Sequence, residues 1–194
     1  MQLSQTRPRV MIDAVWPAAG IWREGALIVA GCLLIALAAY VQILLPFSPV
    51  PVTGQTFAIL LLGALYGSRR GPATVVTYFI LGAIGLPVFA GGAAGLARFA
   101  GPTAGYLLGF VVAGFAVGWL SERGWDRKPW TTAASMIIGN GIIYALGVAW
   151  LWRFVGGEAV LYAGVVPFLP GDALKIALAT ILLPSGWRII GRTA

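Results

Sequence analysis

Long hydrophobic runs dominate the chain, and the charged residues gather between them. Four stretches contain no Asp, Glu, Lys or Arg: residues 25–68, 71–97, 99–121 and 129–152. A helix that crosses the hydrocarbon core of a bilayer needs about 20 mostly apolar residues. The pattern therefore predicts an all-α integral membrane protein.

Six transmembrane helices fit these runs, at about residues 25–45, 54–67, 72–89, 103–120, 131–153 and 166–187. The second range is short, so that helix is either tilted or extended backwards through the proline-rich stretch before it. Residues 1–24 are too polar for a cleaved signal peptide and are expected to form an N-terminal segment, which the basic residues place in the cytoplasm. With no internal repeat and no separate soluble domain, the whole chain, 1–194, is expected to form a single transmembrane domain.

The basic residues predict the orientation in the membrane. Ten of the 13 Lys and Arg fall on one side of the six-helix arrangement, namely Arg7, Arg9, Arg23, Arg69, Arg70, Arg123, Arg127, Lys128, Arg188 and Arg192. Lys and Arg accumulate in the cytoplasmic loops of membrane proteins, so the N- and C-termini are expected in the cytoplasm. The net charge of +7 is then explained by a rim facing anionic lipid headgroups, without a nucleic-acid partner.

Composition excludes several kinds of function. Hydrophobic residues make up 59% of the chain and charged residues 10%, whereas soluble domains carry about a quarter charged residues. There is no histidine, one cysteine, and no GxxxxGK[ST] loop for ATP. Acidic residues other than Asp172 fall at helix ends or in loops, so no carboxylate pair is available for acid–base catalysis. We therefore expect neither an enzyme nor a bound metal or cofactor.

Two opposite charges interrupt the last apolar run. In VVPFLPGDALK, Asp172 and Lys175 are three residues apart, which places them on one face of a helix. Each charge at the centre of a spanning helix is unfavourable by about 2.5–3.5 kcal/mol. Two interpretations remain open: an ion pair that ties helices together, and a polar binding site open to the outside. Pro170 and Gly171 favour the binding site, because they loosen the start of the helix.

Two further stretches have an unusual backbone composition. In LPFSPVPVTGQTFA, three prolines exclude a regular helix and predict a stiff, extended connection that leads to Thr53 and Gln55. In GLPVFAGGAAGLARFAGPTAG, Arg98 is the one charge among many glycines, which permit unusual backbone conformations. The first stretch is either site-lining or simply a tight connection; the second is either a mobile lid or a flexible loop. Gly105, Gly109, Gly114 and Gly118 are expected to allow close helix packing.

Four stretches together carry a family resemblance: PVPVTGQTFAILLLGALYG, GAIGLPVF, GPTAGYLLGF and VVPFLPGDALK. The chain resembles the BioY family, the biotin-binding substrate component (S-component) of energy-coupling factor (ECF) transporters. The resemblance implies a six-helix bundle of the ECF S-component type in the bacterial cytoplasmic membrane, with an outward-facing pocket for biotin. It also implies a transmembrane coupling protein and two nucleotide-binding ATPase subunits as partners. Transport by this chain alone, as a homo-oligomer or by ion coupling, remains the alternative.

The resemblance also implies roles for particular residues. Asp172 would accept from the ureido N–H of biotin, and Lys175 would donate to the ureido carbonyl or another acceptor. Arg98, or backbone N–H groups near Gly91 and Gly92, would bind the valerate carboxylate of biotin. The predicted site is completed by Gln55, Phe89 and Tyr106, and for the two aromatic residues ordinary packing or anchoring at the membrane interface is the alternative.

The first helix offers a surface for coupling to partners. Family members carry two alanines four residues apart there, and Ala26 and Ala30 have this spacing. Generic helix packing explains the same pair equally well.

Overall fold

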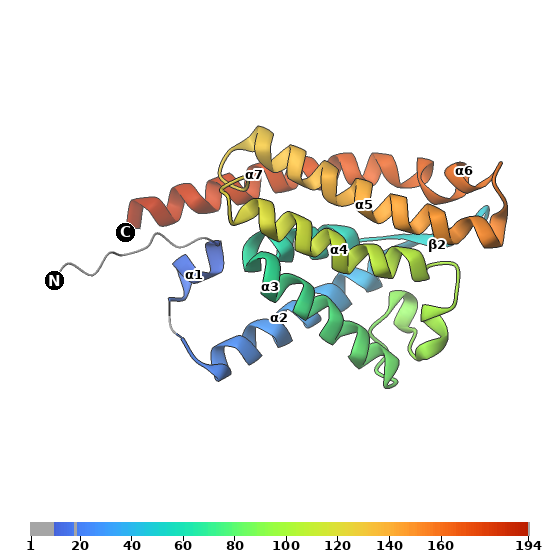
Figure 1. Ribbon diagram of the computed structural model, residues 1–194, viewed down its shortest axis with the longest axis horizontal. Helices are drawn as coiled ribbons and strands as arrows, with labels where there is room; N and C mark the ends of the chain where they lie inside the picture. Colours follow the sequence, from blue (N-terminus) through green and yellow to red (C-terminus); the bar gives the residue numbers. More distant parts are fainter. Residues whose placement is uncertain (1–9, 18, 194) are drawn as a thin grey trace.

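The computed structural model describes residues 10–17 and 19–193 and is helical apart from one β-hairpin in that part of the chain (Figure 1). The elements are, in order, α1 (Met11–Val15), α2 (Ile21–Tyr40), β1 (Gln42–Leu45), β2 (Ser48–Thr53), α3 (Gln55–Ala83), η1 (Ala90–Gly92), η2 (Leu96–Phe99), α4 (Ala104–Ser121), α5 (Pro129–Val155), α6 (Val160–Gly164), η3 (Val166–Phe168) and α7 (Leu169–Thr193).

Helix α3 consists of two helices joined at Gly67. This residue leaves helical geometry with φ 85° and ψ −178°, a conformation that glycine adopts most readily. Gln55 Nε2 donates to Tyr78 Oη over 2.8 Å, although a straight helix would separate residues this far apart by roughly 35 Å. The chain therefore folds back on itself at Gly67. The Glu122 carboxylate accepts hydrogen bonds from Ser68 N and Ser68 Oγ, both at 2.7 Å. It thereby pairs a backbone N–H at the start of the second half of α3, which has no partner within the helix.

The predicted number of transmembrane helices is confirmed. In the described part of the chain, four helical segments are long and apolar enough to cross a membrane: Ile21–Tyr40, Ala104–Ser121, Pro129–Val155 and Val160–Gly191. The two halves of α3 supply the other two helices, where residues 54–67 and 72–89 were expected. The chain is thus a multi-pass membrane protein with an all-α spanning part.

Several helix ends differ from the expected ranges: the first helix begins at Ile21 instead of near residue 25, and the last ends at Thr193 instead of near residue 187. Helix α2 ends at Tyr40 instead of near residue 45, and Gln42–Thr53 forms an antiparallel hairpin that pairs Gln42 with Thr53 and Leu45 with Ser48. The prolines of this segment explain the strands, since they exclude a helix interior. The third helix ends at Ala83, and an irregular connection with η1 and η2 leads to α4. The short helices α1 and α6 were not predicted.

Glycines allow α4 to approach its neighbours closely, as expected. A Cβ at Gly109 would lie 2.9 Å from Ile143 Cα in α5, and one at Gly118 would lie 2.6 Å from the Gly67 carbonyl oxygen. A Cβ at Gly105 would meet Leu146 O in α5. Small residues of this kind let helix backbones pack directly in membranes. The bundle therefore centres on α3, α4 and α5.

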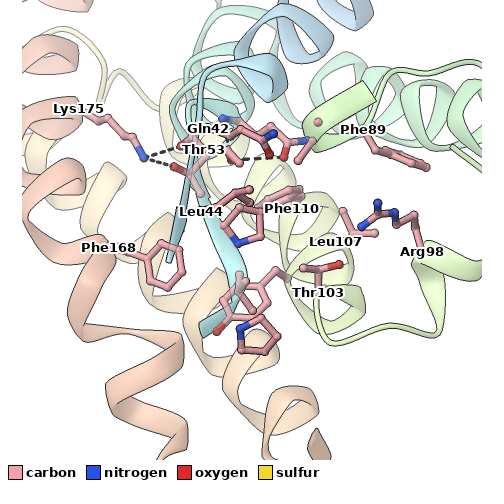
Figure 2. Close-up of a pocket in the computed structure, with 18 residues that line it drawn as sticks. Gln42, Leu44, Thr53, Phe89, Arg98, Thr103, Leu107, Phe110, Phe168 and Lys175 are labelled. Atoms are coloured by element: carbon pink, nitrogen blue, oxygen red, sulfur yellow. Dashed lines mark hydrogen bonds between the residues drawn. The ribbon is translucent and has the colours of Figure 1, made fainter. Parts of the chain in front are cut away.

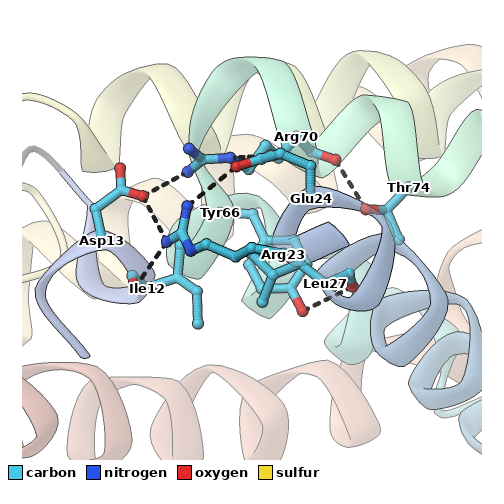
Figure 3. Close-up of polar contacts among 8 residues, drawn as sticks. All are labelled: Ile12, Asp13, Arg23, Glu24, Leu27, Tyr66, Arg70 and Thr74. Atoms are coloured by element: carbon cyan, nitrogen blue, oxygen red, sulfur yellow. Dashed lines mark hydrogen bonds and ion pairs between the residues drawn. The ribbon is translucent and has the colours of Figure 1, made fainter. Parts of the chain in front are cut away.

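An ionic cluster joins α1, α2 and α3 near the start of α2 (Figure 3). Arg23 contacts Asp13 at 2.9 Å and Glu24 at 3.0 Å, and Arg70 contacts Asp13 at 2.8 Å and Glu24 at 2.7 Å. Arg23 is 6% exposed. The cluster lies at the end of the molecule that also holds α1 and the C-terminal part of α7 (Figure 1).

Candidate functional site

A cavity of about 380 Å³ lies between the hairpin, the start of α3, the connection from α3 to α4, the start of α4, and α7 (Figure 2). Its volume is within the range of small-molecule sites, about 300–1,000 Å³. The hairpin, the connection from α3 to α4 and the start of α4, which line the cavity, lie toward the end of the molecule opposite α1 and the C-terminal part of α7 (Figure 1).

Lys175 is the cation on the α7 side of this cavity. Its ammonium donates to Thr53 O at 3.0 Å, to Thr56 Oγ1 at 2.8 Å and to Asp172 Oδ1 at 3.0 Å. A lysine ammonium has three N–H donors, so all of them are used within the protein. A ligand oxygen that binds Lys175 must therefore replace one of these three acceptors.

Asp172 lies behind Lys175 and is not among the residues that line the cavity. It is 4% exposed, and its second carboxylate oxygen accepts from Tyr144 Oη. Its i,i+3 pairing with Lys175 is present as the spacing predicts. A direct contact between Asp172 and a ligand stays a prediction.

Arg98 lines the cavity on the side opposite Lys175 (Figure 2). It belongs to η2 and is exposed. Its guanidinium has no ion pair or side-chain hydrogen bond with the residues that the structure describes. The site therefore presents two cations, one fully hydrogen-bonded to the protein and one available to an anion.

Four more of the predicted site residues line the cavity, namely Gln55, Phe89, Gly91 and Tyr106, and their contact with a ligand stays a prediction. The Gln55 amide donates to Tyr78, and Tyr106 Oη donates to Gly164 O at 2.8 Å, so both side chains are held in place. Gly92 lies outside the lining. Its N–H donates to Phe89 O at 2.9 Å and is thus occupied by the turn itself.

Several lining residues were not singled out from the sequence. The polar ones are Gln42, Thr56 and Thr103, and the aromatic ones are Phe110 and Phe168. All but Gln42 stand in the stretches TGQTFA, GPTAGYLLGF and VVPFLPGDALK, so the motifs indicated the segments without indicating these side chains. Gln42 was missed because its segment was expected to be the end of a helix.

The two alanines of the predicted coupling surface lie elsewhere. Ala26 and Ala30 are both exposed on α2 and take no part in the cavity. Their exposure leaves the pair accessible on the outside of the bundle.

Comparison with known proteins agrees with this architecture. The sequence model of the BioY family matches residues 9–192. The biotin transporter BioY of Rhizobium etli is 39% identical over 158 residues, which cover 77% of this chain and 84% of that protein. The biotin transporter BioY of Thermotoga maritima is 38% identical over 150 residues, which cover 77% of this chain and 86% of that protein.

A solved structure shares the fold. The crystal structure of the S-component for biotin from an ECF-type ABC transporter superposes with a TM-score of 0.74 at 24% identity, covering 87% of this chain and 94% of that one. The family match extends over nearly the whole sequence, including every segment that builds the cavity. The chain belongs to the BioY family.

Proposed function

We propose that this protein is the biotin-binding substrate component of an ECF-type uptake system in the bacterial cytoplasmic membrane, with no catalytic activity of its own. The observation that carries the proposal is the cavity of about 380 Å³ with Lys175 and Arg98 on opposite sides. Biotin has a polar ureido ring at one end and a carboxylate at the other, which matches this arrangement. The two similar proteins are biotin transporters, which supports the same ligand.

The ureido ring is placed beside Lys175. Its carbonyl oxygen takes one N–H of the ammonium from Thr53 O or Thr56 Oγ1, while Asp172 keeps the ammonium in position. The valerate carboxylate reaches Arg98, whose guanidinium suits a two-pronged contact with a carboxylate. The apolar middle of the ligand packs between the aromatic side chains Phe89, Phe110 and Phe168.

The cavity opens to the outside of the cell in this proposal. The support is the charge distribution: the basic residues Arg69, Arg123 and Lys128 lie on exposed loops or helix ends away from the cavity. Energy comes from a transmembrane coupling protein and two ATPase subunits. The exposed pair Ala26 and Ala30 provides the contact surface on α2 for the coupling protein.

Binding to the detergent-purified chain tests the ligand. We expect saturable binding of radiolabelled biotin at micromolar concentrations or below, displaced by unlabelled biotin. Lipoate should compete poorly, because it has the same carboxylate chain without a ureido ring. Absence of binding at micromolar biotin, or equal competition by lipoate, would overturn the assignment.

Reconstitution separates the coupled system from the alternative of autonomous transport. Liposomes that contain this chain alone should bind biotin without accumulating it, with or without a proton gradient. Accumulation by the chain alone would contradict the need for the coupling protein and the ATPase subunits.

A further inference from the structure

A second, much smaller cavity lies directly beside Lys175, between α3, α5 and α7. Its volume is about 10 Å³, and its polar lining consists of Thr56, Asn140 and Lys175. Thr56 and Lys175 also line the large cavity. The small cavity therefore lies behind Lys175, which binds the ligand in the proposed function, and behind Thr56, whose hydroxyl accepts from Lys175.

Asn140 carries an unsatisfied polar atom at this place. The residue is 7% exposed, and its Oδ1 is buried without a hydrogen-bond partner among the described residues. A buried acceptor without a partner is unfavourable by about 1–3 kcal/mol, so native proteins rarely leave one. Along α5, Asn140 lies one turn before Tyr144, whose hydroxyl donates to Asp172. The neighbouring turns of this helix thus face one polar cluster.

We propose that the small cavity is a binding site for one water molecule, anchored by Asn140. A cavity needs roughly 10–15 Å³ of this kind of volume to hold a water, and a buried water needs two to four polar partners. The water donates one hydrogen to Asn140 Oδ1 and the other to Thr56 Oγ1, which has a second lone pair besides the one that Lys175 uses.

The water allows the Lys175 ammonium to exchange Thr56 Oγ1 for a ligand oxygen as its hydrogen-bond acceptor, a step that rests on the proposed function. When the ammonium turns one N–H from Thr56 to a ligand carbonyl, Thr56 Oγ1 still accepts from the water. No buried acceptor is then left unpaired, and no bond to Asp172 has to break. Asn140 is thus a positioning residue: it acts on the ligand through the water, Thr56 and Lys175.

Three variants and one structure determination test the inference. Asn140→Leu removes the anchor and fills the space, so biotin affinity should fall roughly tenfold, the effect of leaving one acceptor unpaired. Met136→Leu changes an apolar wall of the same cavity and should leave affinity within about twofold, since such swaps conserve volume. In a Thr56→Val background, Asn140→Leu should cause no further loss. A crystal structure of the parent should show one ordered water within hydrogen-bonding distance of Asn140 Oδ1.

Each outcome decides a separate point. Density that shows no water beside Asn140, at a resolution where other buried waters are visible, overturns the site even if Asn140→Leu fails to fold. Unchanged biotin affinity in Asn140→Leu, or equal losses in the parent and Thr56→Val backgrounds, overturns the exchange of partners. If the parent does not bind biotin at all, the proposed function fails, while the density still decides the water site.

Discussion

Lys175 and Asp172 form an ion pair with Nζ and Oδ1 3.0 Å apart on α7, and only Lys175 reaches the cavity. A charge pair inside a spanning helix is unfavourable unless it is well hydrogen-bonded. Here every N–H of the ammonium is paired, and both carboxylate oxygens accept. The pair therefore ties α3, α5 and α7 together and also fixes a cation at the wall of the cavity, so an ion pair between helices does not exclude a binding site.

Lys175→Met is expected to abolish biotin binding and lower the stability of the ligand-free protein by about 3 kcal/mol, because it leaves Asp172 as a buried charge without its cation. Thermal unfolding in detergent and equilibrium dialysis with biotin measure the two effects. Tyr144→Phe removes a single hydrogen bond to the Asp172 carboxylate and should lower stability by about 1.5–2 kcal/mol, less than Lys175→Met. Parent-like melting and binding of Lys175→Met would contradict the role of the pair.

Arg98→Gln should weaken biotin binding roughly tenfold to a hundredfold, the effect of losing a charge-assisted hydrogen bond. Biotinamide, whose end group is neutral, should bind this variant and the parent about equally. Arg153→Gln is the matched control: Arg153 stacks on Trp150 at 3.6 Å and does not line the cavity, so both ligands should bind that variant as they bind the parent. Equal losses for biotin and biotinamide in Arg98→Gln would show that Arg98 does not contact the carboxylate.

Much of the fold follows from the sequence because the membrane imposes strong rules. Uncharged runs long enough to cross the bilayer indicate the helices, and the break between the second and third ranges coincides with Gly67. The hairpin is harder to predict. Residues 42–45 are as apolar as the helix before them, and only the prolines that follow indicate that the helix ends early.

The candidate site could be predicted only in part, for a physical reason. Charges in an apolar run are visible in the sequence, so Lys175 and Arg98 could be singled out. Whether a polar residue points into a cavity depends on tertiary packing. Asp172 is 4% exposed behind Lys175, a difference in depth that their i,i+3 spacing does not reveal. Thr56 belongs to the site because α7 brings the Lys175 ammonium to its hydroxyl, a tertiary contact that no local pattern indicates.

Gly118→Ala is expected to destabilise the protein by about 1–3 kcal/mol, the usual range for overpacking. The new Cβ would lie 2.6 Å from both the Gly67 carbonyl oxygen and Ser68 N, backbone atoms of the turn that reverses α3. Gly141→Ala is the matched control within a helix, because no atom lies within 4 Å of its Cβ position. Helix propensity should stabilise that variant by up to about 1 kcal/mol. Melting temperatures that shift equally in both variants would contradict the close approach at Gly67.

Arg23→Met tests the ionic cluster at the end of the molecule away from the cavity. Arg23 is buried, while Asp13 and Glu24 are 35% and 37% exposed and keep their contacts with Arg70. The partial exposure of both acids screens the lost interactions, so we expect a loss of about 1–2 kcal/mol, less than for a fully buried pair. Biotin affinity should stay within about twofold, since no cluster residue lines the cavity.

The matched control for the cluster is Arg123→Met. Arg123 is exposed and stacks on Trp119 at 3.4 Å, so its loss should change stability by less than about 1 kcal/mol. Thermal unfolding at low salt and at 0.5 M salt distinguishes the roles of the two arginines further. Added salt should reduce the difference in stability between the parent and Arg23→Met, because screening weakens in the parent the same ion pairs that the variant lacks. An equal stability loss in both variants would mean that the contacts of Arg23 add nothing to the hold of Arg70 and apolar packing on α1. A drop in biotin affinity in Arg23→Met would instead mean that the two ends of the bundle are energetically coupled.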